Sequence, residues 1–180
     1  YRHVPDDAKK PYGAGTVQAL RIKGVPNTSP YPKPAAGVVT KRLWPDNHEW
    51  VVDWVDIPDR HAKDKSCRTQ ASALGASTFM RGEGITWDGQ SVWFTASLGG
   101  VARAGQIFEY RGSGKDGGRL SLRYEVTDRS VLSCPDNVTM TPWNELLLAE
   151  DNYRSGFGCT HQYIRCMNRK GEIYDIARNR

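Results

Sequence analysis

Two acidic residues, Glu83 and Asp136, hold the same place in an internal repeat. After Glu83 come a small residue, an aliphatic residue, a threonine, a turn and the apolar run Val92-Trp93-Phe94. After Asp136 the same order of residue types ends in Leu146-Leu147-Leu148. The spacing, about fifty residues in a chain rich in β-forming segments, is typical of propeller blades.

Equivalent positions in neighbouring blades lie at one radius, so Glu83 and Asp136 are expected near a common axis. Carboxylates that converge repel each other unless a positive charge neutralises them, and calcium is the hard cation that prefers such oxygen ligands. The repeat therefore predicts a metal site. Two other interpretations remain open: Glu83 bonded to backbone amides at the start of a strand, and Asp136-Asn137 serving the turn after Pro135.

The composition places these residues in a β-rich frame. Glycine (18), proline (10) and tryptophan (6) are frequent, which indicates many turns and few helices. No apolar run is long enough for a membrane-spanning helix. The net charge of +5 comes from scattered lysines and arginines, which favours a solvated surface over a nucleic-acid interface.

Alternating segments around three loops predict the outer hairpins of blades, at residues 2–22, 105–125 and 162–176. The two copies of the repeat supply inner hairpins. We therefore predict an all-β fold, part of a β-propeller with about two full blades plus an outer hairpin. The expected divisions are 1–23 (outer hairpin of a preceding blade), 24–80 (an inter-blade insert), 81–133 (a blade) and 134–180 (a blade).

The insert is predicted to open with an extended proline-rich connection, residues 25–36, and to contain a strand within 44–57. A helix is expected over Lys65 to Leu74, ending at Gly75.

The four cysteines, Cys67, Cys134, Cys159 and Cys166, form no CxxC pair. They are interpreted as buried thiols. A disulfide between Cys159 and Cys166 and a zinc site that includes His161 are the alternatives.

Several motifs together resemble one family. They are Phe79-Met80-Arg81-Gly82-Glu83-Gly84-Ile85, Trp93-Phe94-Thr95, Gly105-Gln106-Ile107, Pro135-Asp136-Asn137 and Leu146-Leu147-Leu148-Ala149-Glu150-Asp151. In order and spacing the chain resembles the PhoX-type alkaline phosphatases over roughly residues 50–180. The resemblance implies an exported, secreted or periplasmic hydrolase that cleaves phosphate esters at a calcium and iron cluster in the mouth of a propeller.

Carried over to this sequence, the resemblance makes Glu83 and Glu150 metal ligands. Asp136 and Asn137 stand where the family keeps an acidic residue beside an amide, and Asp151 is either a ligand or a brace for its loop. The iron-binding members have a cysteine directly before the Glu-Asp pair, whereas this chain has Ala149. A methyl group cannot bind iron, so calcium is expected and iron is doubtful.

The resemblance thus implies a metal-dependent phosphomonoesterase acting on a small phosphate ester. The alternative is a catalytically inactive propeller that serves as a binding or structural subunit of a larger assembly. In either case we expect these residues to be an internal piece of a propeller, completed by blades from unseen chain or from partner subunits. Two blades and a hairpin would otherwise leave apolar strand faces in water.

Overall fold

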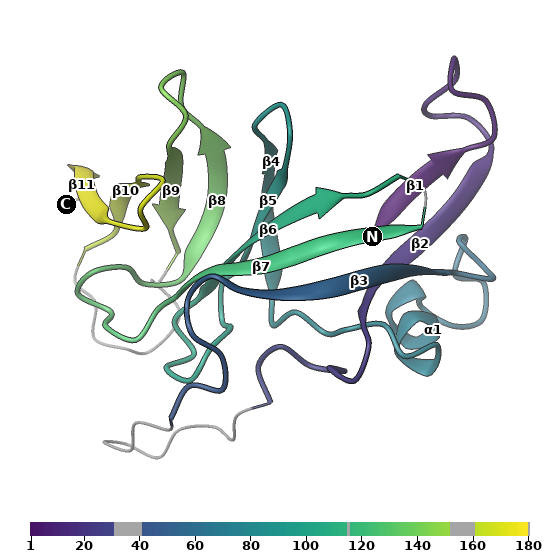
Figure 1. Ribbon diagram of the computed structural model, residues 1–180, viewed down its shortest axis with the longest axis horizontal. Coiled ribbons are helices and arrows are strands. Elements are labelled where there is room, and N and C mark those ends of the chain that lie inside the picture. The colour runs from purple at the N-terminus through teal and green to yellow at the C-terminus, as the bar shows by residue number, and fades with distance from the viewer. Residues whose placement is uncertain (31–40, 115, 152–160, 180) are drawn as a thin grey trace. The chain divides into compact units, whose positions relative to one another are not determined.

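The computed structural model describes residues 1–30, 41–114, 116–151 and 161–179. In these residues the chain forms strands β1 to β11 and one short helix, α1 (Figure 1). The prediction of an all-β fold is therefore confirmed. No helix in the described ranges is both long and apolar enough to cross a membrane.

The chain divides into two compact units. The first unit comprises Tyr1–Thr28, Trp50–Thr78 and Gly112–Arg119, and the second comprises Ser29–Glu49, Phe79–Arg111 and Leu120–Arg180. We describe each unit by itself. The candidate site lies within the second.

In the first unit, β1 (Arg2–Pro5) and β2 (Gly15–Ile22) form the hairpin predicted near the N-terminal end, and β2 pairs with β3 (His48–Asp56). The pairing is antiparallel throughout. Arg21 on β2 and Asp53 on β3 are directly opposed, and two hydrogen bonds of 2.8 and 2.7 Å join them. This bidentate ion pair fixes the register of the two strands.

Helix α1 (Cys67–Ala73) lies within the predicted helical range of 65–74. The hydroxyl of Ser66 caps its N-terminus by accepting a hydrogen bond from the backbone of Thr69. The chain leaves the helix through Gly75, whose φ of +77° suits glycine. Ala71 of the helix packs with Ala19 and Ile57, which attaches α1 to β2 and to the residue directly after β3.

The second unit contains strands of two antiparallel sheets: most of the β7-β6-β5-β4 part of a seven-stranded sheet, and all of a four-stranded sheet. The strands of the seven-stranded sheet in this unit have the order β7-β6-β5-β4, and they are β4 (Gly82–Trp87), β5 (Val92–Ala96), β6 (Gln106–Gly112) and β7 (Gly117–Glu125). The tip of its β6–β7 hairpin belongs to the first unit. Each strand pairs with the next one along the chain, which is the topology of a propeller blade.

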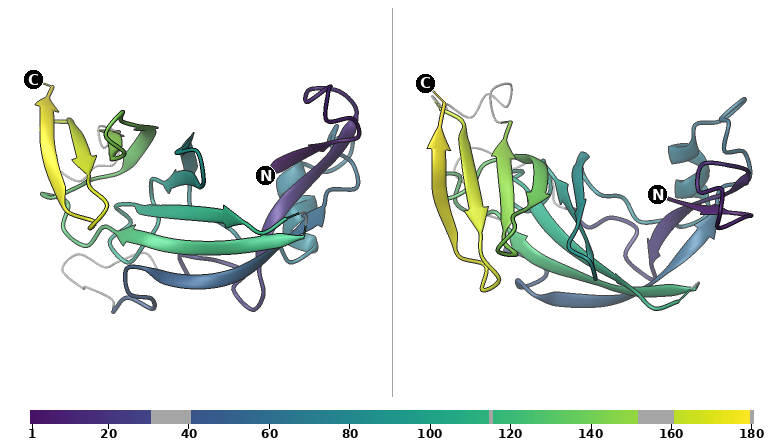
Figure 2. Two further views of the ribbon diagram at one scale, coloured as in Figure 1. Left: turned by 45° about the horizontal axis from the view of Figure 1, so that its top comes forward. Right: turned by 90° about the horizontal axis from the view of Figure 1, so that it is seen from above.

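The second sheet repeats this arrangement with the order β11-β10-β9-β8. Its members are β8 (Pro135–Met140), β9 (Leu146–Glu150), β10 (Tyr163–Met167) and β11 (Ile173–Arg178). Its strands, coloured green to yellow, lie side by side in Figure 2. The two inner hairpins and the two outer hairpins at 105–125 and 162–176 therefore form where the sequence predicts them.

An apolar core joins the two sheets of the second unit. Trp93 and Ile107 from the first sheet pack with Val138, Leu148 and Met167 from the second. Alternation along each strand places these residues on one face, and burial of each large side chain stabilises the fold by about 1.5 to 3 kcal/mol.

Some predictions fall on residues outside the described ranges. The proline-rich connection lies there in part, as does Cys159 of the suggested disulfide. The other three cysteines, Cys67, Cys134 and Cys166, are free thiols, and Cys134 and Cys166 are buried.

Candidate metal centre

Glu83 and Asp136 each begin a β-bulge, and the two bulges are equivalent. On β4, Gly82 pairs with Ala96 and Ile85 with Phe94, so Glu83 and Gly84 together oppose Thr95. On β8, Pro135 pairs with Glu150 and Val138 with Leu148, so Asp136 and Asn137 oppose Ala149. Two residues against one bend a strand and redirect its side chains. The repeat in the sequence is thus a repeat of an irregular backbone feature.

The residue directly before each of these strands, two positions before the first residue of the bulge, also has an unusual conformation. Arg81 has φ of +56° and Cys134 has φ of +50°, and few non-glycine residues adopt these left-handed values. The carbonyl of Arg81 accepts a hydrogen bond from the backbone of Ser97 (2.8 Å), and the carbonyl of Cys134 accepts one from Asp151 (3.0 Å). Backbone strain of this kind clusters at functional sites, so the starts of β4 and β8 are candidate positions for such a site.

The two bulges touch. A Cβ atom on Gly84 would lie 2.6 Å from the carbonyl oxygen of Asp136 and 2.7 Å from the backbone nitrogen of Val138. Only glycine allows backbones to approach so closely. The hydroxyl of Thr95 accepts a hydrogen bond from the Gly84 N–H (3.0 Å) and donates one to the Asp136 carbonyl (2.7 Å). Residues from both sheets therefore build one small region.

The charges in this region are unbalanced. Burial raises the pKa of Asp136, and the carboxylates of Glu83 and Asp151 raise it further, while Arg81 opposes the shift. Arg81 donates to one oxygen of Glu83 through two nitrogens, at 3.0 and 3.2 Å. Three carboxylates thus share a neighbourhood with one guanidinium. This excess of negative charge favours the binding of a cation.

Glu150, the fourth predicted carboxylate, bonds to Arg165 and to two backbone amides. One oxygen accepts hydrogen bonds from the Ser133 backbone (2.9 Å) and the Arg165 guanidinium (2.8 Å), and the other accepts one from the Tyr163 backbone (3.1 Å). Its side chain is only 1% exposed. These contacts stabilise the loop before β8 and the start of β10. The structure brings Glu150 into contact with Arg165.

The remaining predicted ligand, Asn137, is exposed, and its side-chain oxygen lies 3.1 Å from the backbone nitrogen of Val138. In the described parts of the chain, no three or more His, Cys, Asp or Glu side chains form a compact metal-holding group. The donor types still fit a hard cation, since Glu83, Asp136 and Asp151 offer carboxylate oxygens. Ala149, opposite the second bulge, offers no donor for a softer metal.

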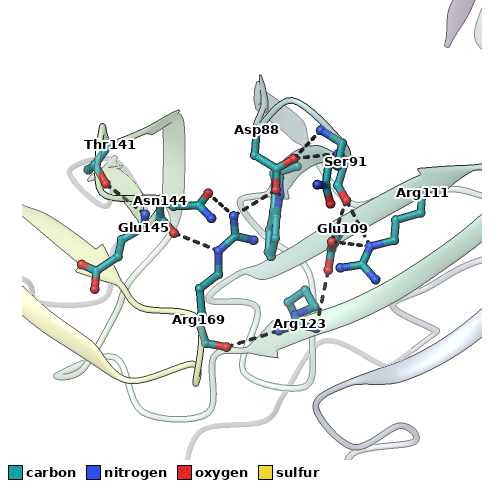
Figure 3. A network of polar contacts seen from close by, with 11 residues as sticks. Asp88, Ser91, Glu109, Arg111, Arg123, Thr141, Asn144, Glu145 and Arg169 are labelled. Carbon is teal, nitrogen blue, oxygen red and sulfur yellow. Dashed lines mark hydrogen bonds and ion pairs between the residues drawn. The ribbon is translucent and has the colours of Figure 1, made fainter.

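The ends of β4 and β8 that lie opposite the candidate site carry a second polar network (Figure 3). Arg169, from the loop between β10 and β11, bonds to Asp88 after β4 (3.1 Å) and to the carbonyl of Asn144 before β9 (2.8 Å). Burial alone would raise the pKa of Asp88, but hydrogen bonds from Ser91, Trp93 and other groups hold it well below its usual range. This network ties the two blades together away from the candidate site.

Sequence reasoning missed three contributors to the site. Arg81 was part of the recognised motif, but its positive φ and its position among the carboxylates have no sequence signal. Gly84 and Thr95 act through contacts with Asp136 on β8, which is 41 residues after Thr95 in the sequence. The glycine directly after the acidic residue is the one clue that could have suggested a close backbone approach.

Comparison with known proteins adds two findings. A family model described as "Alkaline phosphatase PhoX" matches residues 1–180. Among solved structures, the chain is similar to PhoX of Pseudomonas fluorescens in complex with vanadate, a transition state analogue, with a TM-score of 0.60 and 18% identity. That match covers 89% of this chain and 35% of the other, so this chain spans about a third of that structure. The search of curated proteins gave no match. The structural likeness confirms the predicted fold, part of a β-propeller.

Proposed function

The chain belongs to the alkaline phosphatase PhoX family, and from this premise we propose that it supplies part of the active site of a metal-dependent phosphomonoesterase. The family resemblance predicted from the sequence is thereby confirmed. The observation that carries the proposal is the contact between two equivalent bulges, which gathers Glu83, Asp136 and Asp151 beside Arg81.

In this proposal Glu83, Asp136 and Asp151 hold calcium, because carboxylate oxygens are the ligands that this ion prefers. The cation, when bound, supplies positive charge that stabilises the phosphoryl oxygens as negative charge develops on them. Asn137, exposed beside Asp136, offers one more oxygen donor. Glu150 keeps Arg165 and the loop before β8 in place.

Arg81 is the group of this chain best suited to contact the substrate. Its side chain is 58% exposed, and its guanidinium lies beside Glu83. A planar guanidinium can donate two parallel hydrogen bonds to a phosphate group. The unusual backbone conformation of Arg81 fixes where its side chain leaves the strand. We infer that Arg81 orients the phosphate ester against the carboxylate-bound cation.

Ala149 lacks the donor that iron would need, so we propose calcium without iron at this part of the site. Metal analysis of the full-length protein by mass spectrometry tests this, and stoichiometric iron would contradict it.

We also propose an exported location, secreted or periplasmic, by analogy with the family.

The test of function uses the full-length protein and p-nitrophenyl phosphate. We expect hydrolysis that EDTA abolishes and calcium restores. Glu83→Gln should lower kcat/KM by roughly 100-fold or more, since it removes a charge from the cation site. Asp64→Asn makes the same change at an exposed carboxylate of the first unit and should leave activity unchanged.

A different outcome would favour the alternative. Calcium binding without hydrolysis would indicate a propeller that has kept its scaffold and lost catalysis, and now acts as a binding or structural subunit. Ala149, at the position where iron-binding members carry a ligand, is the observation that favours this alternative.

A further inference from the structure

Thr95 stands opposite the first acidic bulge, and its side chain reaches the second. It is the single residue of β5 that opposes Glu83 and Gly84 on β4, and its side chain is completely buried. Its hydroxyl oxygen is 3.0 Å from the Gly84 nitrogen and 2.7 Å from the Asp136 carbonyl oxygen. One hydroxyl thus connects the residue after Glu83 to the backbone of Asp136 itself.

The chemistry of these contacts explains why position 95 carries a hydroxyl group. A bulge leaves some backbone groups out of the sheet's regular hydrogen-bond ladder. Gly84 presents a donor and Asp136 presents an acceptor, and a hydroxyl can serve both at once. Valine has the same shape as threonine but can serve neither.

The second blade provides an internal comparison. Ala149 stands opposite the second bulge as Thr95 stands opposite the first. A regular role in blade packing would be expected at both positions. The hydroxyl is present only at the position whose side chain reaches the bulge of the neighbouring blade, which ties its presence to the contact between Glu83-Gly84 and Asp136.

We propose that Thr95 is a positioning residue that sets the separation of the Glu83 and Asp136 carboxylates and so tunes their affinity for a divalent cation. The inference rests on the proposed function, since it takes these carboxylates as cation ligands. Gly84 brings the two backbones into contact, and Thr95 fixes their relative position along the strands. Hard cations require ligand distances within a narrow range, so a small displacement of either bulge changes binding.

The test measures calcium binding to the metal-free full-length protein by isothermal titration calorimetry, with amide hydrogen exchange of the segment that contains Gly84. Thr95→Val should weaken calcium binding by about 10- to 100-fold, the usual range for residues that orient metal ligands. It should also speed exchange at Gly84. Thr95→Ser retains the hydroxyl and should restore both properties. Thr139→Val, at an exposed threonine of β8, is the matched control and should change neither.

The outcomes separate this inference from the function on which it rests. If the unaltered protein does not bind calcium, the metal site itself is wrong and the role of Thr95 falls with it. If the unaltered protein binds calcium and Thr95→Val binds it equally well, Thr95 is only structural and the inference alone is overturned. Should Thr95→Val fail to fold, Thr95→Ala places at position 95 the residue that the second blade accepts at 149, and the same criteria apply.

Discussion

At the scale of single residues, the candidate site carries an excess of negative charge. Glu83, Asp136 and Asp151 bring three negative charges, and Arg81 brings one positive charge, so the group has a formal net charge of −2. The raised pKa of Asp136 reflects this crowding together with burial. A divalent cation would balance this charge. Without the cation, repulsion among the carboxylates should lower the stability of the folded protein at neutral pH.

The first prediction is that Asp136→Asn stabilises the metal-free protein at pH 7. The folded-state pKa of Asp136 is raised, so its contribution to folding is most favourable below the unfolded pKa of about 3.9 and is lost as pH rises through the folded value. The amide avoids this loss at pH 7 and gains nothing at pH 3. Because Asp136 is only half-buried and solvent screens its charge, the rise in Tm should be small, on the order of 1–2 °C.

Thermal unfolding followed by circular dichroism in EDTA, at pH 7 and at pH 3, checks the pH dependence. Asp64→Asn is the control and should not change Tm at either pH. A loss of stability at pH 7 in Asp136→Asn would show that the carboxylate is stabilised by its surroundings and would contradict the charge argument.

The next scale is that of the elements, where β4 and β8 are held together at both ends. At the candidate site the contact depends on the missing side chain of Gly84 and on the Thr95 hydroxyl. At the opposite end it depends on Arg169, whose guanidinium also lies 5.3 Å from the Trp93 ring centre. The two ends use different chemistry, so each can be tested without disturbing the other.

Gly84→Ala should destabilise the protein by about 1–3 kcal/mol, the usual cost of forcing a group into packed space. The added methyl group would collide with backbone atoms of β8, which cannot rotate away as a side chain could. Gly82→Ala is a matched control two residues earlier in the same strand, where the nearest atom to an added Cβ is 4.0 Å away. Urea unfolding of both variants provides the comparison. Equal stability of the two would mean that the bulges do not touch.

Replacing Arg169 tests the other end. Arg169→Ala should cost about 1–3 kcal/mol, because the Asp88 carboxylate, only 5% exposed, loses a charged hydrogen-bond donor. Lys170→Ala removes a neighbouring exposed positive charge and should have little effect in the same urea titration. The Arg169→Ala protein should keep its calcium affinity, since the network lies at the far end of the inner strands. A large loss of calcium binding would show that the two ends are coupled.

At the scale of the whole molecule, the sequence predicted the features that repeat and missed those that depend on packing. The hairpins follow from alternation and turn residues, and the equivalence of Glu83 and Asp136 follows from the repeat. The bonding of Glu150 to Arg165 could not be foreseen, because it depends on which strand pairs with β9. The Thr95 contact links two blades, and non-local contacts of this kind leave no local pattern in the sequence. The domain ranges and the metal ligands remain predictions.

The last prediction concerns the coupling of calcium to the stability of the full-length protein. A ligand that binds only the folded state stabilises it by about 2.7 kcal/mol at a concentration of 100 times its Kd. For a domain of 150–250 residues this corresponds to roughly 5–10 °C in Tm. We expect Tm to rise with the logarithm of calcium concentration in the unaltered protein, and to rise much less in Glu83→Gln and Asp136→Asn. Magnesium, which demands a stricter octahedral geometry, should shift Tm less than calcium at equal concentration. A calcium response in Glu83→Gln and Asp136→Asn as large as in the unaltered protein would place the calcium site elsewhere, outside the contact between β4 and β8.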